Sequence, residues 1–309
     1  MATKKQRLDV ILVEKGLAES RERARSAILA GLVRVKGQRV DKAGTLIAAD
    51  ADVTVEANAC PYVSRGGFKL ARALEVFDLS LQGLRIIDVG ASTGGFTDVA
   101  LKNGASRVIA VDVGYGQLAW SLRQDERVRS LERTNIRYVT AEQLGEKAQV
   151  ATIDVAFISL EKVLPAVKDL LEGPGHVIAL IKPQFEAGKD KVGKKGVVRD
   201  RAVHREVITR LVNWSYEQDW KVLGLDYSPI TGPEGNIEYL LWLQKKEADE
   251  SGVDESEANE LEVNGSEANE SLADDDNTNE ISADKTNKIS AEIISDLVDK
   301  AHESLPLKK

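Results

Sequence analysis

The stretch 84–113 constrains the fold of this chain more than any other part of the sequence. It begins with a short apolar run rich in β-branched residues, Arg85 to Val89, which stops at a glycine-rich turn over residues 90–95. From Phe96 the apolar residues recur at helical spacing until an Asn-Gly pair ends the pattern, and Arg107 to Val111 is a second apolar run. A strand, a tight loop, a helix and a strand in this order predict a βαβ unit, and hence a parallel sheet.

The glycine-rich loop indicates a ligand site. Glycines between a strand and a helix let a ligand approach the backbone, and the helix N-terminus offers unpaired N–H groups. The order Gly90-x-x-x-Gly94-Gly95 departs from the dinucleotide fingerprint and favours a nucleoside ligand such as S-adenosylmethionine (SAM). A purely structural turn is the alternative. Asp88 near the end of the first strand and Asp112 after the second favour the ligand, because Asp112 could accept hydrogen bonds from a ribose diol.

Composition indicates the class of protein. The 309 residues suit about two domains, and the single cysteine, Cys60, excludes a disulfide framework and indicates a reducing compartment. No apolar run is long enough to span a bilayer and the N-terminus lacks a signal-peptide pattern, so we expect a cytoplasmic protein. Residues 247–309 hold 19 acidic residues against 5 lysines, so the net charge of −8 conceals a basic body at residues 1–246. Such a body permits a polyanionic partner, although ordinary solubility would explain it equally well.

Residues 1–58 predict a small α+β domain, which a linker at 59–64 joins to the rest. The pattern indicates a short helix near the N-terminus, a second helix from Arg21 to Ala30, a hairpin around Lys36-Gly37 and a strand at 53–55. Several cations fall on the second helix and the hairpin, where they suit phosphate contacts in structured RNA or form a solvated basic face. These cations are Arg21, Arg25, Arg34, Lys36 and Arg39. The segment resembles the αL RNA-binding motif of a small-subunit ribosomal protein, pseudouridine synthases and tyrosyl-tRNA synthetases.

Residues 65–246 keep alternating between strand and helix patterns. After the βαβ unit, we expect strands at 128–131, 152–158, 176–181, 221–227 and 237–243, and helices at 117–123, 160–171 and 203–219, with a capping box at 140–143. A further helix, 64–77, precedes the unit. Seven strands with intervening helices predict an α/β, doubly wound, Rossmann-like sheet. The last two strands have no room for a helix between them, so they should be antiparallel.

Three charged residues occur where these strands should be apolar. Asp154 lies inside the predicted strand 152–158, Lys182 directly follows VIALI, and Glu238 begins EYLLWL. Ligands bind at the carboxyl ends of strands in open α/β sheets, so these residues indicate a catalytic cluster rather than three separate strand-end charges. His176 and His204 lack the company of other metal ligands, and we interpret them as structural.

The whole of residues 4–246 resembles the TlyA family. The motifs that carry the resemblance are SRGGFKL, IIDVGASTGGFTD, AVDVGYGQL, RTNIR, DVAFISL, IKPQFEAG, GVVRD and GNIEYLLWL. The resemblance implies an αL motif followed by an FtsJ-like domain with a sheet of the SAM-dependent methyltransferase type. It also implies 2′-O-methylation of cytidines in 16S ribosomal RNA, 23S ribosomal RNA or both, with SAM as cofactor and no metal. It also implies that a catalytic Lys-Asp-Lys-Glu set falls on Lys69, Asp154, Lys182 and Glu238.

General chemistry assigns roles within this set. A ribose hydroxyl becomes a good nucleophile only when its proton is removed, and a lysine can remove it only if its pKa falls towards neutrality. We expect Lys182 to be the base, with burial and the ammonium of Lys69 lowering its pKa. Asp154 would orient Lys182 and the methyl donor, and Glu238 would position Lys69 or the ribose; both carboxylates would oppose the lowering.

Further site residues follow from the loop and from the resemblance. The cofactor-binding residues should be Asp88, Gly90, Ala91, Ser92, Thr93, Gly94, Gly95, Phe96, Asp112 and Asn135. RNA contacts are expected from the N-terminal cations and also from Arg65, Lys189 and Lys191, of which the last two lie in a basic loop at 185–201. A solvated loop is the alternative there.

The tail, 247–309, lies beyond the resemblance. Residues 247–285 have a composition typical of disorder, and Ile289 to Leu305 shows the apolar spacing of a terminal amphipathic helix. Two other functions remain open at this stage. One is a non-catalytic ribosome-binding factor that cannot bind SAM; the other is a membrane-lytic protein, which the older family name of hemolysin suggests and the acidic polar face of the terminal helix disfavours.

Overall fold

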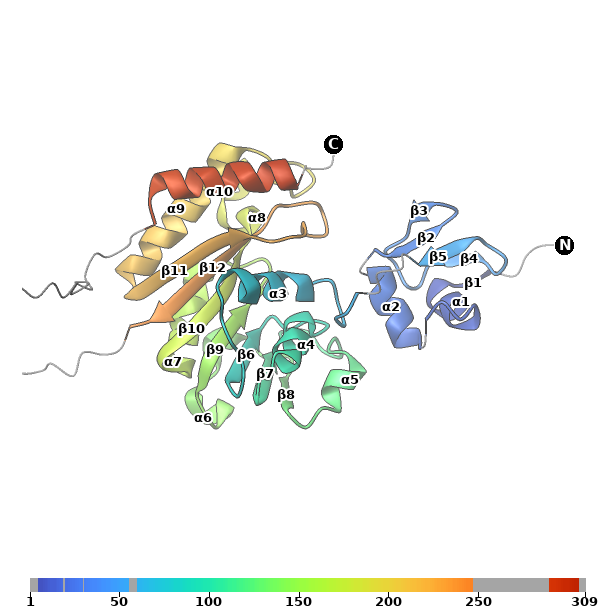
Figure 1. Cartoon of the computed structure of the whole chain (residues 1–309), viewed down its shortest axis with the longest axis horizontal. Helices are drawn as coiled ribbons and strands as arrows, with labels where there is room; N and C mark the ends of the chain where they lie inside the picture. Colours follow the sequence, from blue (N-terminus) through green and yellow to red (C-terminus); the bar gives the residue numbers. More distant parts are fainter. Residues whose placement is uncertain (1–4, 19, 30, 56–59, 247–288, 306–309) are drawn as a thin grey trace, which may run out of the picture. The chain divides into compact units, whose positions relative to one another are not determined.

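The computed structural model describes residues 5–18, 20–29, 31–55, 60–246 and 289–305 (Figure 1). The ends of the predicted domain 1–58, the end of the second helix at Ala30 and the start of the linker at Ala59 lie outside these residues, as does the whole acidic segment 247–285.

The N-terminal part contains two helices and two small sheets. Its elements are β1 (Lys5–Arg7), α1 (Leu8–Glu14), α2 (Arg21–Leu29), β2 (Val33–Val35), β3 (Gln38–Arg39), β4 (Leu46–Ala48) and β5 (Val53–Val55). Strands β3, β2 and β5 form one sheet, and β1 pairs with β4 in another. The helices pack their apolar faces, which include Leu8, Leu12 and Ile28, into a common core with Val33. The predicted hairpin is confirmed: Lys36 and Gly37 both have positive φ, as the tight turn between paired strands requires.

The central sheet of the larger part has seven strands. They are β6 (Arg85–Val89), β7 (Arg107–Val111), β8 (Val128–Leu131), β9 (Ala148–Ile153), β10 (Leu171–Ile181), β11 (Trp220–Tyr227) and β12 (Tyr239–Lys245). Their order is β11-β12-β10-β9-β6-β7-β8. The strands from β8 to β10 pair in parallel, whereas β12 is antiparallel to both β10 and β11. The predicted seven-stranded α/β sheet with an antiparallel final pair is therefore confirmed.

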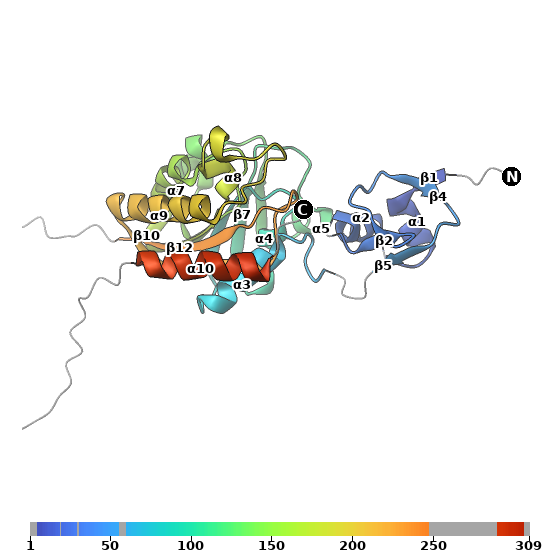
Figure 2. The same ribbon diagram turned by 90° about the horizontal axis from the view of Figure 1, so that it is seen from above.

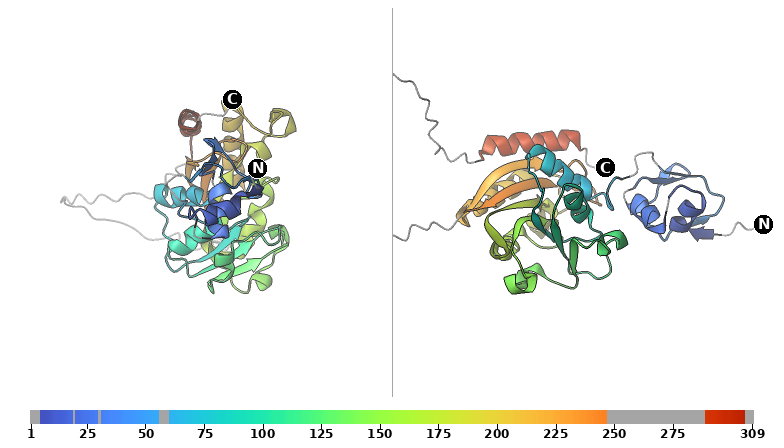
Figure 3. Two further views of the ribbon diagram at one scale, coloured as in Figure 1. Left: turned by 90° about the vertical axis from the view of Figure 1, so that its right-hand side faces the viewer. Right: turned by 60° about the horizontal axis from the view of Figure 1, so that its bottom comes forward.

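Helices cover both faces of this sheet, as Figure 3 shows. One face carries α3 (Gly67–Val76), α4 (Gly95–Lys102) and α5 (Trp120–Arg123). The other face carries α6 (Ala141–Leu144), α7 (Leu164–Leu170), α9 (Arg201–Glu217) and α10 (Ala291–Ser304). Short turns complete the chain: η1 (Ile136–Tyr138), η2 (Leu160–Lys162), α8 (Pro183–Glu186) and η3 (Lys189–Lys191). Two apolar cores, one on each side of the sheet, hold these layers together.

Two predicted boundaries were wrong in ways that affect the site. The strand predicted at 152–158 ends at Ile153, and Phe157 lies in a loop with φ of 63° and 90% exposure. Apolar residues that leave the sheet cannot be distinguished by periodicity from residues that stay in it. The helix predicted at 160–171 is divided into η2 and α7, because Pro165 allows an α-helix to start there but not to continue through it.

The predicted terminal helix is confirmed as α10. Ser290 caps it by accepting a hydrogen bond from the Ile293 backbone N–H. Its apolar face, with Val298 and Ala301 fully buried, packs against α9 and β11 (Figure 2).

Candidate active site

The strand order reverses between β6 and β9, and the candidate site lies at the carboxyl ends of these two strands. Such a reversal is where ligands bind in doubly wound sheets. Gly90 follows β6 with φ of 82°, and a Cβ added there would lie 2.6 Å from the carbonyl oxygen of Asp154. Only glycine can therefore hold the loop this close to the end of β9.

A second close approach positions α3. A Cβ added to Gly95, the first residue of α4, would lie 2.8 Å from the backbone nitrogen of Gly67, the first residue of α3. The N-terminal ends of α3 and α4 can therefore pack this closely only because Gly95 has no side chain. In the first turn of α3, Lys69 is buried and its ammonium lies near Asp154.

Asp88, near the end of β6, links the strand to α4 and β9 on either side of the glycine loop. It is buried in β6, where Oδ2 accepts a hydrogen bond from Thr97 Oγ1 at 2.6 Å and Oδ1 accepts one from Thr152 Oγ1 at 3.1 Å. Burial raises the pKa of this carboxyl to about 6, and the two hydroxyls only partly offset that effect. Although Asp88 was predicted to bind the cofactor, its oxygens are directed at α4 and β9.

Asp112 holds the other side of the loop. Its Oδ2 accepts a hydrogen bond from the Ser92 backbone N–H at 2.8 Å, and its Oδ1 accepts one from Gly114 N–H at 2.7 Å. Each carboxylate oxygen can accept a further bond, so Asp112 can both fix the loop and bind a diol. Asn135, predicted to lie on the adenine side, uses Oδ1 to accept from the Arg137 backbone N–H and cap η1.

The four charged residues of the predicted catalytic set meet at this edge of the sheet. Lys69 Nζ lies 2.6 Å from Glu238 Oε2 and 3.3 Å from Asp154 Oδ2. Asp154 Oδ1 contacts Lys182 Nζ, so this carboxylate bridges the two lysines. The four side chains are between 2% and 20% exposed. Asp154 directly follows β9, Lys182 directly follows β10, and Glu238 directly precedes β12.

The two carboxylates fix the protonation state of Lys69. Burial alone would lower its pKa, but the attraction of Asp154 and Glu238 outweighs burial, so the pKa is raised above its ordinary value. Burial would likewise raise the pKa of Asp154, yet its two lysine neighbours lower it. At neutral pH the cluster therefore contains a permanent ammonium at Lys69 and a permanent carboxylate at Asp154.

An aromatic pair that the sequence analysis did not identify lies beside Lys182. The rings of Phe157 and Phe185 have centroids 4.9 Å apart, and Lys182 Nζ lies 6.0 Å from the Phe185 centroid. Phe157 lies in the loop after β9, and Phe185 lies in the short helix α8 after β10. Phe157, three residues after Asp154, could have indicated an aromatic contact near the site. It was instead assigned to the interior of the strand predicted at 152–158.

The predicted RNA-binding cations are mostly exposed. Arg34 and Arg39 are directly opposed across β2 and β3, and therefore lie on the same face of that small sheet. Arg25 on α2 and Lys36 in the hairpin turn are also exposed. Arg21 remains 60% exposed while it pairs with the buried carboxylate of Asp9 at 3.1 Å, so part of its role is to stabilise the domain.

The remaining predicted RNA contacts belong to the larger part. Arg65 Nη2 donates to the Thr231 carbonyl at 2.6 Å, within the loop that leads to Glu238. Lys191 pairs with Glu206 at 2.5 Å, whereas Lys189 is exposed. The geometry thus separates Lys189, which is available to a ligand, from two cations that already hold protein groups.

Some features are absent from the part of the chain that the structure describes. Within residues 5–18, 20–29, 31–55, 60–246 and 289–305, no cluster of three or more His, Cys, Asp or Glu side chains is arranged to hold a metal ion. No helix in those ranges has the length and apolar content needed to cross a membrane. His176 instead accepts from Trp242 Nε1 at 3.1 Å, and His204 lies among Tyr239, Val198 and His302.

Comparisons with known proteins agree with the fold described above. The model of the FtsJ-like methyltransferase family matches residues 62–245, and the S4 domain model matches residues 6–53. The chain is 52% identical to YqxC of Bacillus subtilis over 82% of its length and 91% of that protein. It is 45% identical to the Mycobacterium tuberculosis 16S/23S rRNA (cytidine-2′-O)-methyltransferase TlyA over 77% of its length and 89% of that protein. A solved Streptococcus thermophilus structure, named as a hemolysin, is 40% identical, covers 98% of each chain and gives a TM-score of 0.67.

Proposed function

This chain belongs to the FtsJ-like methyltransferase family, with TlyA proteins among its relatives, and on that premise we propose that it transfers a methyl group from SAM to a ribose 2′-hydroxyl of ribosomal RNA. The observation that carries the proposal is the buried cluster of Lys69, Asp154, Lys182 and Glu238. Two lysines that share one carboxylate at the cofactor edge of the sheet provide both a fixed cation and a candidate base.

The residues around the glycine loop fit SAM. Gly90 and Gly94 have positive φ and open the backbone to a ligand, and Asp112 can accept hydrogen bonds from a ribose diol. SAM would supply a methyl group made electrophilic by its sulfonium. The carboxylate of Asp154, held ionised by Lys69 and Lys182, would favour a cation at this point.

Lys182 is the base in this proposal. Its Nζ would take the proton of the 2′-hydroxyl as the ribose oxygen attacks the methyl carbon; the bond between that carbon and the sulfonium sulfur would break, and S-adenosylhomocysteine would leave. Lys182 contacts only Asp154 within the cluster, whereas Lys69 is held by two carboxylates, so Lys182 is the better candidate for the base.

The S4 domain and the exposed aromatic side chains would hold the RNA. Arg25, Arg34, Lys36 and Arg39 can contact phosphates of folded RNA. Unstacked bases bind to aromatic faces, and the Phe157–Phe185 pair provides such a face next to Lys182. We propose cytidines in ribosomal subunits of the cytoplasm as the targets, since the similar TlyA protein is named for cytidines of both ribosomal RNAs.

The test is transfer of labelled methyl from SAM to 30S subunits, 50S subunits and naked ribosomal RNA. We expect label on RNA at a nucleotide that becomes resistant to alkaline hydrolysis, because a 2′-O-methyl group removes the hydroxyl that cleaves the chain. Label on a base would overturn the 2′-O assignment. SAM binding with no transfer to any of the three substrates would contradict ribosomal RNA as the target, and failure to bind SAM would favour a non-catalytic ribosome-binding factor. Leakage from liposomes would instead support the hemolysin name carried by the Streptococcus thermophilus relative.

A further inference from the structure

The terminal helix α10 lies outside the region that the family model matches, yet it is packed into the larger domain. Ile294, Leu297, Val298 and Ala301 bury their side chains in the same apolar core as α9 and β11. Asp299 adds ion pairs to α9, with Arg201 Nη1 at 2.7 Å and Arg205 Nη2 at 2.8 Å. Figure 2 shows the helix running alongside α9.

A polar contact joins the end of α10 to the interior. His302 Nε2 lies 3.2 Å from His204 Nδ1, and the two ring centroids are 4.8 Å apart. His204 is fully buried on α9, and its Nε2 lies 3.1 Å from the Val198 carbonyl. A carbonyl can only accept, so His204 carries its proton on Nε2 and presents Nδ1 as an acceptor. Nδ1 has one lone pair, which the Tyr239 hydroxyl at 2.7 Å and the His302 Nε2–H at 3.2 Å share as donors.

His204 connects two segments that frame the candidate site. Tyr239 directly follows Glu238, the carboxylate that holds Lys69. On the other side, the Val198 backbone N–H donates to Asn236 Oδ1 at 3.0 Å, and Asn236 Nδ2 donates to the Gly196 carbonyl at 2.9 Å. Asn236 is buried two residues before Glu238. The basic loop and the start of β12 are therefore both tied to one imidazole, and α10 supplies the third polar contact of that imidazole.

We propose that His302 is a positioning residue for methyl transfer: through His204 and Tyr239, docking of α10 fixes the Glu238 carboxylate against Lys69. The proposal rests on the proposed methyltransferase function. It makes the terminal helix part of the structure that supports the site.

The charges around the two histidines support a neutral pair at physiological pH. Burial lowers the pKa of His204 to about 4, and burial together with Arg201 lowers the pKa of His302. The facing groups are Asp200, Arg201 and Arg205 on α9 and its cap, Asp299 on α10 and Tyr239 on β12. Acidification from pH 7 towards pH 5 should protonate the pair preferentially in the undocked state, and so weaken docking.

The test compares three single variants of the full-length chain. His302→Ala removes the contact, His302→Gln keeps an amide donor near the position of Nε2, and Glu303→Ala changes an exposed neighbour on the same helix. We expect His302→Ala to lower kcat about tenfold with little change in KM for SAM, because misplacement at a distance acts on the chemical step. His302→Gln should recover most of the loss, and Glu303→Ala should match wild type. Thermal unfolding verifies that every variant is folded at the assay temperature.

A second readout does not depend on activity. Hydrogen exchange of the amides in residues 196–200 and 228–239 should accelerate in His302→Ala and not in Glu303→Ala. If His302→Ala matches Glu303→Ala in both kcat and exchange, the inference is overturned. If wild type transfers no methyl group to any RNA, the proposed function fails, and the exchange data alone decide whether α10 positions the Glu238 segment.

Discussion

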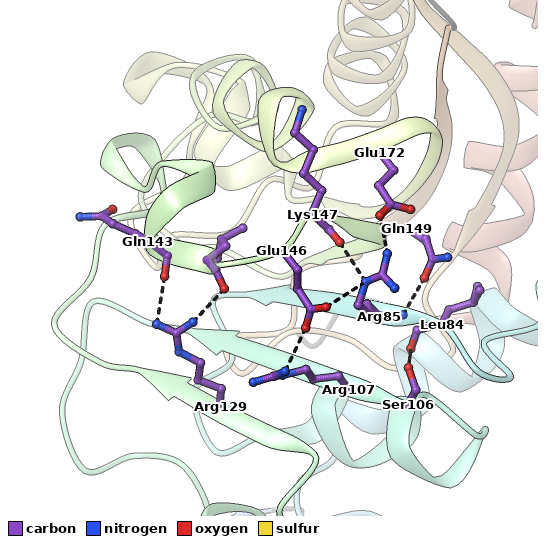
Figure 4. Close-up of polar contacts among 11 residues, drawn as sticks. Leu84, Arg85, Ser106, Arg107, Arg129, Gln143, Glu146, Lys147, Gln149 and Glu172 are labelled. Carbon is purple, nitrogen blue, oxygen red and sulfur yellow. Dashed lines mark hydrogen bonds and ion pairs between the residues drawn. The ribbon is translucent and has the colours of Figure 1, made fainter.

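The two edges of the central sheet both carry clusters of charged side chains, but in different surroundings. At the amino ends of the strands, Arg85 pairs with Glu172 and Glu146, and Arg107 shares Glu146 at 3.0 Å (Figure 4). These side chains are 31% to 50% exposed. At the carboxyl ends, the set built around Lys69 and Asp154 is at most 20% exposed.

This difference in exposure indicates that the cluster at the amino ends contributes to stability, whereas the cluster at the carboxyl ends contributes to the chemistry. Exposed ion pairs are screened by water and salt, and each contributes up to about 1 kcal/mol to stability. Buried pairs cost desolvation to form, and removing one partner leaves an uncompensated charge. A protein gains little stability from a buried four-charge cluster, so its presence at the ligand edge of the sheet is better explained by chemistry than by folding.

The largest effect should follow from loss of the base. Lys182→Ala should lower the single-turnover rate of methyl transfer by about 10²–10⁴-fold, because that is the usual contribution of a positioned general base. SAM affinity, measured by calorimetry, should change little. Arg107→Ala, at the opposite edge of the sheet, is the control and should keep the wild-type rate. A rate loss in Arg107→Ala equal to that in Lys182→Ala would contradict the distinction between the two edges.

The next effect concerns stability at the buried edge. Lys69→Met removes the cation that pairs with Glu238 and leaves Asp154 paired with Lys182 alone. The free energy of unfolding should fall by roughly 3–5 kcal/mol, because Glu238 becomes an uncompensated buried charge. Urea titration at pH 7 measures the change. Lys300→Met, which breaks the exposed pair with Asp296 on α10, is the matched control and should cost less than about 1 kcal/mol. Equal losses in the two variants would show that burial does not decide the cost.

Asp88 provides a test within a single strand, since Arg85 begins β6 and Asp88 lies near its end. The pKa of Asp88 is about 6 in the folded chain and 3.8 in its reference state, so its contribution to stability is present below pH 4 and is lost as pH rises through 6. Asp88→Asn stays neutral. Its stability relative to wild type should therefore rise by roughly 2–3 kcal/mol between pH 4 and pH 7.

Urea titrations across that pH range measure the difference. Asp190→Asn, in an exposed turn, serves as control and should follow wild type at every pH. A parallel pH dependence for wild type and Asp88→Asn would show that the buried carboxyl does not titrate in this window.

The smallest effect should come from the exposed edge. Arg107→Gln should lower the free energy of unfolding by no more than about 1 kcal/mol, and the loss should shrink in 1 M salt, which screens the pair with Glu146. Thermal unfolding at low and high salt measures it. A loss of several kcal/mol that does not change with salt would show that the ion pairs at this edge behave like the buried pairs at the other edge.

Much of the sheet could be predicted because nearby residues in the sequence mark where each strand ends. The boundaries of β6, β7 and β8 match the prediction, since β-branched runs there end at glycine or polar residues. Strands β1 and β4 were missed, because three residues without alternation carry no periodic pattern.

The site was less accessible to reasoning from sequence. Lys69 is one lysine on a helix, and only the approach of α3 to α4 through Gly95 shows that it meets Asp154. The contact between His204 and His302 joins residues 98 positions apart, and no local pattern reports such a pair. Tertiary contacts decide which charges are buried, and burial decides what those charges can do.

The most direct measurement is the single-turnover rate of methyl transfer by Lys182→Arg. Arginine keeps the positive charge beside Asp154 but cannot lose its proton near neutral pH, so it separates a base from a fixed cation. We predict a rate as low as that of Lys182→Ala, with SAM and RNA affinity retained. A rate within a few fold of wild type would contradict the account, since Lys182 would then act only through its charge.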